Sequence, residues 1–245
     1  MIYVGKTNRG NVRKNNEDSL YISEGENKYF IVADGMGGHL GGEEASSLAT
    51  KIVAEVLDGK EISSVIEAQE EIAFAIKKAN TAIYEKGKED IHLRGMGTTL
   101  SLLYFFEDEI IFSNIGDSRI YSLEDNTLTK LTKDDSFVNY LVEIGDITEE
   151  EANHHPKKNV LTKALGTSEN IEFKVFRKKL SMKEKFLLCS DGLSNMVEEK
   201  AIAKIMRDND LERAGDLLIK EALKNGGLDN ITLIVIDLNE VDDDR

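Results

Sequence analysis

The chain has very little of several residues that reinforce or interrupt folds: one cysteine, one proline and no tryptophan among 245 residues. A single cysteine excludes an internal disulfide, and one proline with 19 glycines leaves little material for a flexible linker. No apolar run approaches the roughly 18 residues that a membrane-spanning helix needs. The start of the chain also lacks the pattern of a signal peptide. We therefore expect one cytoplasmic domain that covers residues 1–245.

Positive charge is also scarce. Lys and Arg number 31 against 46 Asp and Glu, so the formal net charge is −15. This balance disfavours nucleic acids and anionic membranes as partners, and it is compatible with cations and with phosphorylated proteins. Apolar residues make up 40% of the chain, which is enough for a sizeable core. The expected state is a monomer.

The order of the hydrophobic patterns predicts the fold class. Strand patterns and helical patterns occur in blocks and do not alternate, which argues against a doubly wound parallel sheet. Several strands are apolar on both faces, so we expect an α+β fold, a four-layer αββα sandwich of two mostly antiparallel sheets flanked by helical pairs. The predicted strands are 1–8, 19–23, 28–33, 98–106, 109–114, 118–123, 127–131, 171–177, 185–190 and 230–238. The predicted helices are about 45–57 and 65–83, two short ones within 136–154, then 197–206 and 211–224.

Four aspartates border predicted strands. Asp34 and Asp191 follow strands, Asp229 precedes the last one, and Asp18 precedes the first strand of a hairpin that ends at Asp34. An antiparallel hairpin brings Asp18 and Asp34 to the same end of a sheet. Clustered carboxylates repel one another unless cations lie between them, and all-oxygen ligands select Mg²⁺ or Mn²⁺. We predict a site for two or three divalent cations, with the Gly35 carbonyl as a further ligand.

Each motif also has a simpler interpretation. Asp-Gly is the commonest hairpin-turn dipeptide, so the pair at Asp34 could be only a turn. Asp117 lies between two predicted strands and is either a further ligand or the cap of a tight turn. Cys189 lies within an apolar run and is expected to be a buried small side chain. A phosphate-binding loop of the Gly-x-x-x-x-Gly-Lys-[Ser/Thr] type does not occur.

Two further residues suit phosphate chemistry. Arg13 lies five residues before Asp18 and could bind a phosphate with two hydrogen bonds, or form a surface ion pair with Glu17. His39 lies five residues after Asp34 and could protonate a leaving group as a general acid. Together with the cation site, these residues indicate a metal-dependent hydrolase.

The ordered set of motifs resembles the metal-dependent protein phosphatase 2C (PPM) family, and most of all its compact single-domain bacterial members. The set covers the chain from about residue 3 to 238. It consists of Arg13 with Asn16-Glu-Asp18, Asp34-Gly-Met-Gly-Gly-His39, Gly97-Thr-Thr99, Asn114-Ile-Gly-Asp-Ser-Arg119, Leu131-Thr with Asp134-Asp-Ser136, Leu161-Thr-Lys-Ala-Leu-Gly166, Cys189-Ser-Asp-Gly-Leu193 and Asp229-Asn-Ile-Thr232. It departs from the family at one position. The family often has the sequence Asp-His-Ser, and this chain has Asp135 in place of the histidine.

The resemblance implies an αββα sandwich and a serine/threonine phosphatase in which a metal-bridged hydroxide attacks phosphoserine or phosphothreonine. Asp34 would bridge two Mn²⁺ or Mg²⁺ ions, and the Gly35 carbonyl would complete one of the two sites. Asp191 and Asp229 would hold the other ion, while Asp18 would act through a metal-bound water.

The resemblance also implies roles outside the paired ions. Asp117 with Asp191 would form a third metal site, Arg13 would bind the phosphate, and His39 would be the general acid. Residues from about 140 to 170 match a mobile flap, and the implied partner is a eukaryotic-like serine/threonine kinase. A module that binds metal or phosphoproteins without catalysis would lack a ligand, and this chain lacks none. Hydrolysis of small phosphorylated metabolites stays open.

Overall fold

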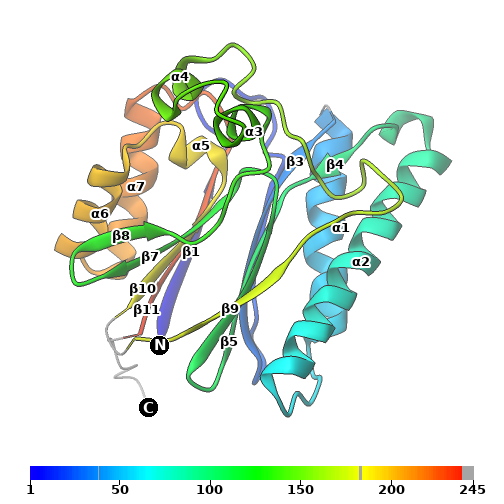
Figure 1. Ribbon diagram of the computed structural model, residues 1–245, viewed down its shortest axis with the longest axis horizontal. Helices are drawn as coiled ribbons and strands as arrows, with labels where there is room; N and C mark the ends of the chain where they lie inside the picture. The colour runs from blue at the N-terminus through cyan, green and yellow to red at the C-terminus, as the bar shows by residue number, and fades with distance from the viewer. Residues whose placement is uncertain (38, 182–183, 239–245) are drawn as a thin grey trace.

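The computed structural model describes residues 1–37, 39–181 and 184–238, and it has the four-layer αββα arrangement (Figure 1). Each of the two central sheets is antiparallel. The first has the strand order β1-β11-β10-β7-β8 and the second β2-β3-β5-β6-β9, with β4 paired to β3. The strands are β1 (Ile2–Asn8), β2 (Asp18–Ile22), β3 (Lys28–Met36), β4 (Gly97–Thr98), β5 (Leu100–Phe106), β6 (Glu109–Ile115), β7 (Arg119–Glu124), β8 (Thr127–Lys130), β9 (Val175–Lys179), β10 (Lys185–Cys189) and β11 (Ile231–Asp237).

One helical pair covers the outer face of each sheet (Figure 1). The second sheet carries α1 (His39–Leu57) and α2 (Val65–Glu89), followed by the 3-10 turn η1 (Ile91–Leu93). The first sheet carries α6 (Glu199–Asp208) and α7 (Leu211–Lys224), with the short α5 (Asp191–Ser194) before them. Among the described residues, no helix is both long and apolar enough to cross a membrane.

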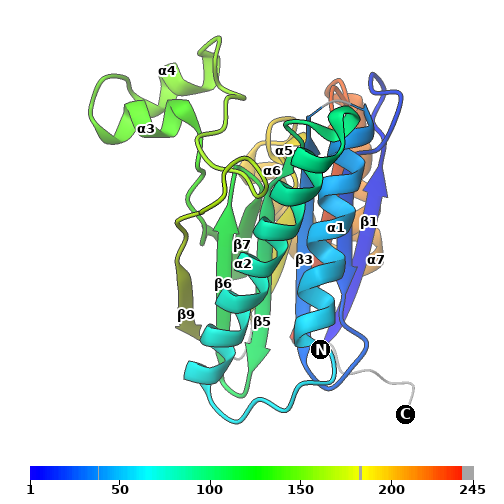
Figure 2. The same ribbon diagram turned by 90° about the vertical axis from the view of Figure 1, so that its right-hand side faces the viewer.

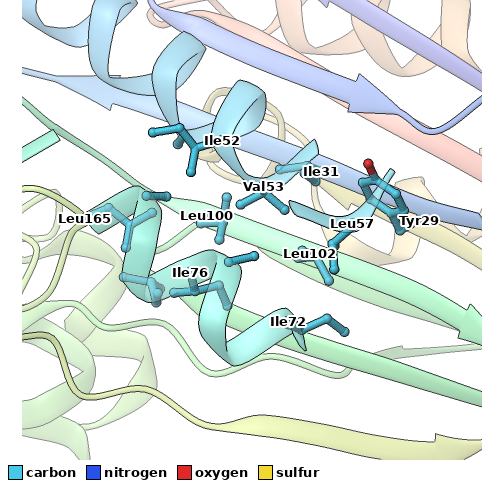
Figure 3. Packing of buried hydrophobic residues seen from close by; sticks show 14 of the residues in the cluster. Tyr29, Ile31, Ile52, Val53, Leu57, Ile72, Ile76, Leu100, Leu102 and Leu165 are labelled. Carbon is cyan, nitrogen blue, oxygen red and sulfur yellow. The ribbon is translucent and has the colours of Figure 1, made fainter. Parts of the chain in front are cut away.

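Three apolar clusters join the four layers. The cluster between the sheets includes Phe30 and Val32 from one sheet and Phe186 and Ile234 from the other. A second cluster packs α6 and α7 on the first sheet. The third lies beneath α1 and α2, where Ile52 and other helix residues meet strand residues of β3 and β5 (Figure 3). Fully burying one such aliphatic side chain stabilises the fold by about 1.5–3 kcal/mol, so these clusters fix the spacing of the layers.

A helical excursion lies between β8 and β9. It contains α3 (Phe137–Glu143) and α4 (Glu149–His154), and it stands away from the body of the sandwich (Figure 2). Ser136 caps α3, and Thr148 forms a capping box with Glu151 at the start of α4. The two short helices expected within residues 136–154 are confirmed. The excursion overlaps most of the segment expected to be a flap, residues 140–170.

The sequence-based prediction of the fold class and of most elements is confirmed. The strand expected at 98–106 is divided into β4 and β5, and the helices expected at about 45–57 and 65–83 extend to His39 and to Glu89. Three further differences concern β3, β9 and α5. Strand β3 runs on to Met36 because β4 pairs with Gly35 and Met36. The strand expected at 171–177 begins only at Val175. Phe173 lies before it and packs its side chain on the core beneath α2, and the Ser113 hydroxyl bonds to the carbonyl of Lys174 at 2.9 Å. The short helix α5 was not predicted, since four residues give no periodicity.

Candidate metal centre

The two aspartates of the first hairpin face each other across neighbouring strands. Asp18 opens β2 and pairs in register with Asp34 in β3, as the hairpin pattern predicted. Like charges in directly opposed positions destabilise a sheet. Asp18 Oδ2 accepts a hydrogen bond from the Ser190 hydroxyl at 2.8 Å, whereas Oδ1 is buried and has no hydrogen-bond partner among the described residues. One oxygen of this carboxylate is thus left for a ligand.

Asp34 is the electrostatic centre of the cluster. Its pKa is raised well above the ordinary value, first by burial and then by the negative charges of Asp18, Asp191, Asp117 and Asp229. All four other carboxylates predicted as ligands therefore lie close enough to act on this one side chain. The structure brings together residues that are up to 211 positions apart in the sequence, from 18 to 229.

Asp191 brings the first sheet to the same place. It follows β10 as the first residue of α5, and its Oδ2 accepts a hydrogen bond from Asn195 Nδ2 at 3.0 Å. Its Oδ1, like Oδ1 of Asp18, is a buried carboxylate oxygen that lacks a partner among the residues described. Burial and then the charge of Asp229 raise the pKa of Asp191 to about 6, while a hydrogen bond with Asp34 acts in the opposite direction. The carboxylates of Asp34 and Asp191 are therefore close neighbours in the cluster.

Asp117 lies on the Asp191 side of the cluster. It follows Gly116 in the β6–β7 turn, where φ is +95° and a Cβ would lie 2.5 Å from the Thr99 methyl carbon, so only glycine fits there. Burial, and then the negative charges of Asp191 and Asp134, raise the pKa of Asp117 to about 7. This placement matches a carboxylate that shares a cation with Asp191.

Arg13 and Asp229 form an ion pair at the edge of the cluster. The distance from Arg13 Nη2 to Asp229 Oδ2 is 2.6 Å, and 51% of the Arg13 side chain is exposed. The alternative partner considered from the sequence, Glu17, is not the residue with which this guanidinium pairs. The loop before β2 therefore presents a cation beside the carboxylates, with half of its surface open to an incoming anion.

Gly35 is required by close packing of the backbone. A Cβ at this position would lie 2.1 Å from the carbonyl oxygen of Gly42 and 2.5 Å from that of Glu17. Its amide donates to the Glu17 carbonyl at 3.1 Å. The absence of a side chain lets the first turns of α1 approach the end of β3 directly beside Asp34.

Asn230 was not singled out from the sequence, yet it holds the Arg13 loop. Its Nδ2 donates to the carbonyls of Arg9 and Asn15, both at 2.9 Å, and its Oδ1 accepts from the Glu17 amide at 2.8 Å. One buried side chain thereby ties both ends of the loop that carries Arg13 to the start of β11. The signal available in the sequence was its position directly after Asp229.

His39 begins α1. Its side chain, to which the general-acid role was assigned, lies outside the described part of the molecule. Gly38 before it also lies outside. Cys189 is buried at the end of β10, as expected, and burial raises the pKa of its thiol to about 12, which makes it a poor nucleophile.

The donor set fits hard divalent cations. In the described ranges, no three side chains of Asp, Glu, His or Cys already converge as a finished ligand shell. The carboxylates instead approach in pairs, as Asp18 with Asp34 and Asp34 with Asp191, and Asp18 and Asp191 each keep one buried oxygen without a partner. Carboxylates in this arrangement favour either protonation or a cation between them, and oxygen-only donors are those that Mg²⁺ and Mn²⁺ prefer.

Comparison with known proteins places the whole chain within one family. The family model described as protein phosphatase 2C matches residues 5–224. The chain is 37% identical over 240 residues to the serine/threonine phosphatase stp of Listeria welshimeri, an alignment that covers 96% of this chain and 94% of that protein.

Solved structures give the same result. The serine/threonine phosphatase PstP/Ppp of Mycobacterium tuberculosis superimposes with a TM-score of 0.90 at 37% identity, covering 98% of this chain and 99% of that one. The catalytic domain of PstP in complex with two manganese ions superimposes with a TM-score of 0.84 at 35% identity, covering 96% and 97%.

Proposed function

The chain belongs to the protein phosphatase 2C family and is a metal-dependent serine/threonine protein phosphatase, and from this premise we propose how its residues divide the work. Asp34 and the Gly35 carbonyl would hold one cation, and Asp34, Asp191 and Asp229 would hold a second, with Asp18 beside them. Asp117 and Asp191 would hold a third. The ions are Mn²⁺ or Mg²⁺. The observation that carries this assignment is geometric: Asp18 and Asp34 pair in register across β2 and β3, and Asp18 and Asp191 each keep a buried carboxylate oxygen that has no hydrogen-bond partner among the described residues.

Bound cations of this kind supply Lewis-acid activation of a water nucleophile and neutralise charge on the phosphoryl oxygens. Side chains of the protein bind and orient the phosphate ester. The partly exposed guanidinium of Arg13 binds two phosphoryl oxygens, which fixes the orientation of the ester. Asp229 holds this guanidinium at the edge of the cluster before the substrate arrives. Asn230 keeps the loop in place while the arginine exchanges or shares its partner.

Proton transfer to the leaving group completes the reaction. A serine or threonine alkoxide is a poor leaving group, so a general acid within reach of its oxygen accelerates the reaction by about 10²–10⁴-fold. His39 takes this role, because it begins the helix that packs against Gly35 and Asp34. No phosphorylated enzyme intermediate is needed, and the buried thiol of Cys189 takes no part.

The biological setting follows from the same proposal. The phosphatase acts on phosphorylated proteins in the cytoplasm as a monomer and opposes a eukaryotic-like serine/threonine kinase. A single phosphatase domain spans residues 1–245, and the α3–α4 excursion, with residues from about 140 to 170, serves as its flap.

The test measures phosphate release from a phosphothreonine peptide with Mn²⁺ or Mg²⁺, and again after chelation. We expect turnover that needs the metal and that Asp34→Asn abolishes, while circular dichroism of the variant stays that of the wild type. Asp125→Asn is the matched control, since it makes the same chemical change in the exposed β7–β8 turn. Turnover by Asp34→Asn at saturating Mn²⁺ would refute the assignment, and faster hydrolysis of nucleotides than of phosphoproteins would move the substrate class to metabolites.

A further inference from the structure

A concave surface lies outside the carboxylate cluster. It is a groove of about 840 Å³ between α2, the β6–β9 edge of the second sheet and the segment that enters β9. Figure 2 shows this edge, with α2 crossing in front of the sheet and the chain descending from the α3–α4 excursion to β9. Its apolar lining consists of Ile66, Ala73, Phe112, Ile171, Phe173 and Phe176, together with Val175.

Two of these apolar side chains are unusually open to solvent. Ile66 is 65% exposed and Phe176 is 48% exposed, and Phe176 stacks on Phe112 with ring centroids 5.5 Å apart. Isolated apolar residues are ordinary on a surface, but a contiguous apolar patch inside a concavity is typical of a binding site. The aromatic pair provides a flat floor on which a large side chain can lie.

Lysines surround this apolar floor. The lining contains Lys77, Lys133, Lys163 and Lys174, against the three carboxylates of Glu70, Asp135 and Glu172. The lining is therefore close to neutral, in a chain with a net charge of −15.

Two of the lysines are already paired. Lys163 pairs with Asp135 at 3.4 Å, and Lys133 pairs with Glu143. Lys77 and Lys174 have no carboxylate within 4.0 Å among the described residues. These two ammonium groups are free to meet acidic groups on a partner.

One lining residue of the groove is hydrogen-bonded to the turn that carries Asp117. Asp135 lines the groove, and its amide donates to the carbonyl of Gly116 at 2.8 Å, directly before Asp117. Its own carbonyl accepts from the Thr162 amide at 2.8 Å, which ties the groove to the base of the α3–α4 excursion. A polypeptide whose phosphoresidue reaches Asp34 and Asp117 therefore meets this groove as a neighbouring surface.

We propose that the groove binds a segment of the phosphoprotein substrate that flanks the phosphoresidue and carries a large apolar side chain among acidic neighbours. This inference rests on the proposed phosphatase function and adds a substrate class to it. The apolar side chain lies on the Phe112–Phe176 floor beside Ile66, and the acidic neighbours meet Lys77 and Lys174. The enzyme then selects among phosphoproteins by the residues that flank the phosphoresidue, and these flanking residues do not contact the metal centre.

The experiment compares two phosphothreonine peptides of equal length. One carries alternating Glu and Phe on both sides of the phosphothreonine and the other carries Gly and Ser. About ten residues on each side cover roughly 33–36 Å in extended form, so either direction of binding is sampled. p-Nitrophenyl phosphate, which has no flanking segment, reports the metal centre alone.

We expect KM to be about tenfold lower for the Glu/Phe peptide than for the Gly/Ser peptide, equivalent to about 1.4 kcal/mol. Ile66→Ser and Lys174→Glu remove most of this advantage through KM, while kcat and the turnover of p-nitrophenyl phosphate stay unchanged. The first control is Ile91→Ser, at an apolar residue that is 69% exposed and does not line the groove. The second is Lys220→Glu, at a residue of α7, the helix that packs on the first sheet. Neither control changes the preference.

Equal KM values for the two peptides, or an unchanged preference in both groove variants, would overturn the proposal. Light scattering that shows a dimer lost on Ile66→Ser would assign the groove to a second copy of the chain and would also overturn it. A wild-type protein that turns over neither peptide would instead contradict the proposed function, so the two failures can be told apart.

Discussion

The carboxylate cluster predicts an unusual dependence of stability on pH and metal. Burial and mutual repulsion raise the pKa of Asp18 and of Asp117 from 3.8 to about 7 in the folded protein, and that of Asp191 to about 6. Between pH 4 and 7 the folded state therefore binds more protons than the unfolded chain does. The free energy of unfolding of the metal-free protein must then fall as the pH rises through this window.

The size of the effect follows from these pKa values. A rise from 3.8 to about 7 corresponds to about 4 kcal/mol for one isolated group. Each of these aspartates is half-buried as a whole residue, so water screens part of the repulsion, and we expect a total loss of about 1–3 kcal/mol between pH 5 and pH 8. In a chain of this length each kcal/mol moves the melting temperature by about 2–4 °C.

Binding of a divalent cation should restore the free energy of unfolding that the metal-free protein loses at high pH. A cation that binds only the folded protein, at a hundred times its dissociation constant, adds about 2.7 kcal/mol. Thermal unfolding at pH 8 should therefore shift upward by roughly 5–11 °C with Mn²⁺, and by less at pH 5, where protons compete. Asp34→Asn removes the central negative charge, so the metal-free variant should melt above the metal-free wild type at pH 8 and should not respond to Mn²⁺.

Differential scanning calorimetry at pH 5 and pH 8, with chelator and with Mn²⁺, measures all of these shifts. Asp125→Asn should follow the wild type throughout, because this residue lies in a turn outside the cluster. A metal-free wild type as stable at pH 8 as at pH 5, with Asp34→Asn no more stable than it, would refute the reasoning. The carboxylates would then not repel one another, and the case for a cation site would fail.

Three other outcomes can be checked by steady-state kinetics. Asp191→Ala should abolish phosphopeptide turnover while the protein keeps its circular dichroism spectrum, and residual turnover at saturating Mn²⁺ would remove it from the ligand set. His39→Ala should slow a phosphoserine peptide far more than p-nitrophenyl phosphate, whose leaving group needs little protonation; equal slowing of the two would exclude a general acid. Asn230→Asp keeps the acceptor for the Glu17 amide but loses both donors to the Arg13 loop. The Asn230→Asp substitution should raise KM about tenfold when Arg13 is present and hardly at all when it is combined with Arg13→Ala. If the two substitutions instead raise KM independently and additively, Asn230 does not act through Arg13.

The sequence was most informative where a metal-binding residue type lies at the end of a predicted strand. The hairpin from Asp18 to Asp34 is local, so its register could be predicted from the strand patterns and a short turn. The positions of Asp191 and Asp229 next to strands β10 and β11 also sufficed to place them at one end of a sheet, because those strands are antiparallel neighbours. Buried strands with apolar residues on both faces sufficed for the two covered sheets.

Contacts between distant segments could not be predicted in the same way. Arg13 pairs with a carboxylate 216 residues away, and no local pattern distinguishes that partner from the nearby Glu17. The amide of Asn230 bonds to three backbone groups of a loop more than 200 residues earlier. Backbone partners carry no sequence signature. For the same reason the groove beside β9 was missed, because it is formed by a helix, a sheet edge and a loop that only the fold brings together.

The placement of the site explains why the inter-sheet core matters for catalysis. Asp18 and Asp34 come from one sheet, while Asp191 and Asp229 come from the other, and among the described strands no pairing joins the two sheets. Their separation is set by apolar contacts such as the edge-to-face pair of Phe105 and Phe186, with ring centroids 5.6 Å apart. Side-chain hydrogen bonds across the gap, such as that from Ser190 to Asp18, are few and can form only at that spacing. The nonpolar interior thus holds together two half-sites that would otherwise repel each other, and the cations convert that repulsion into binding energy.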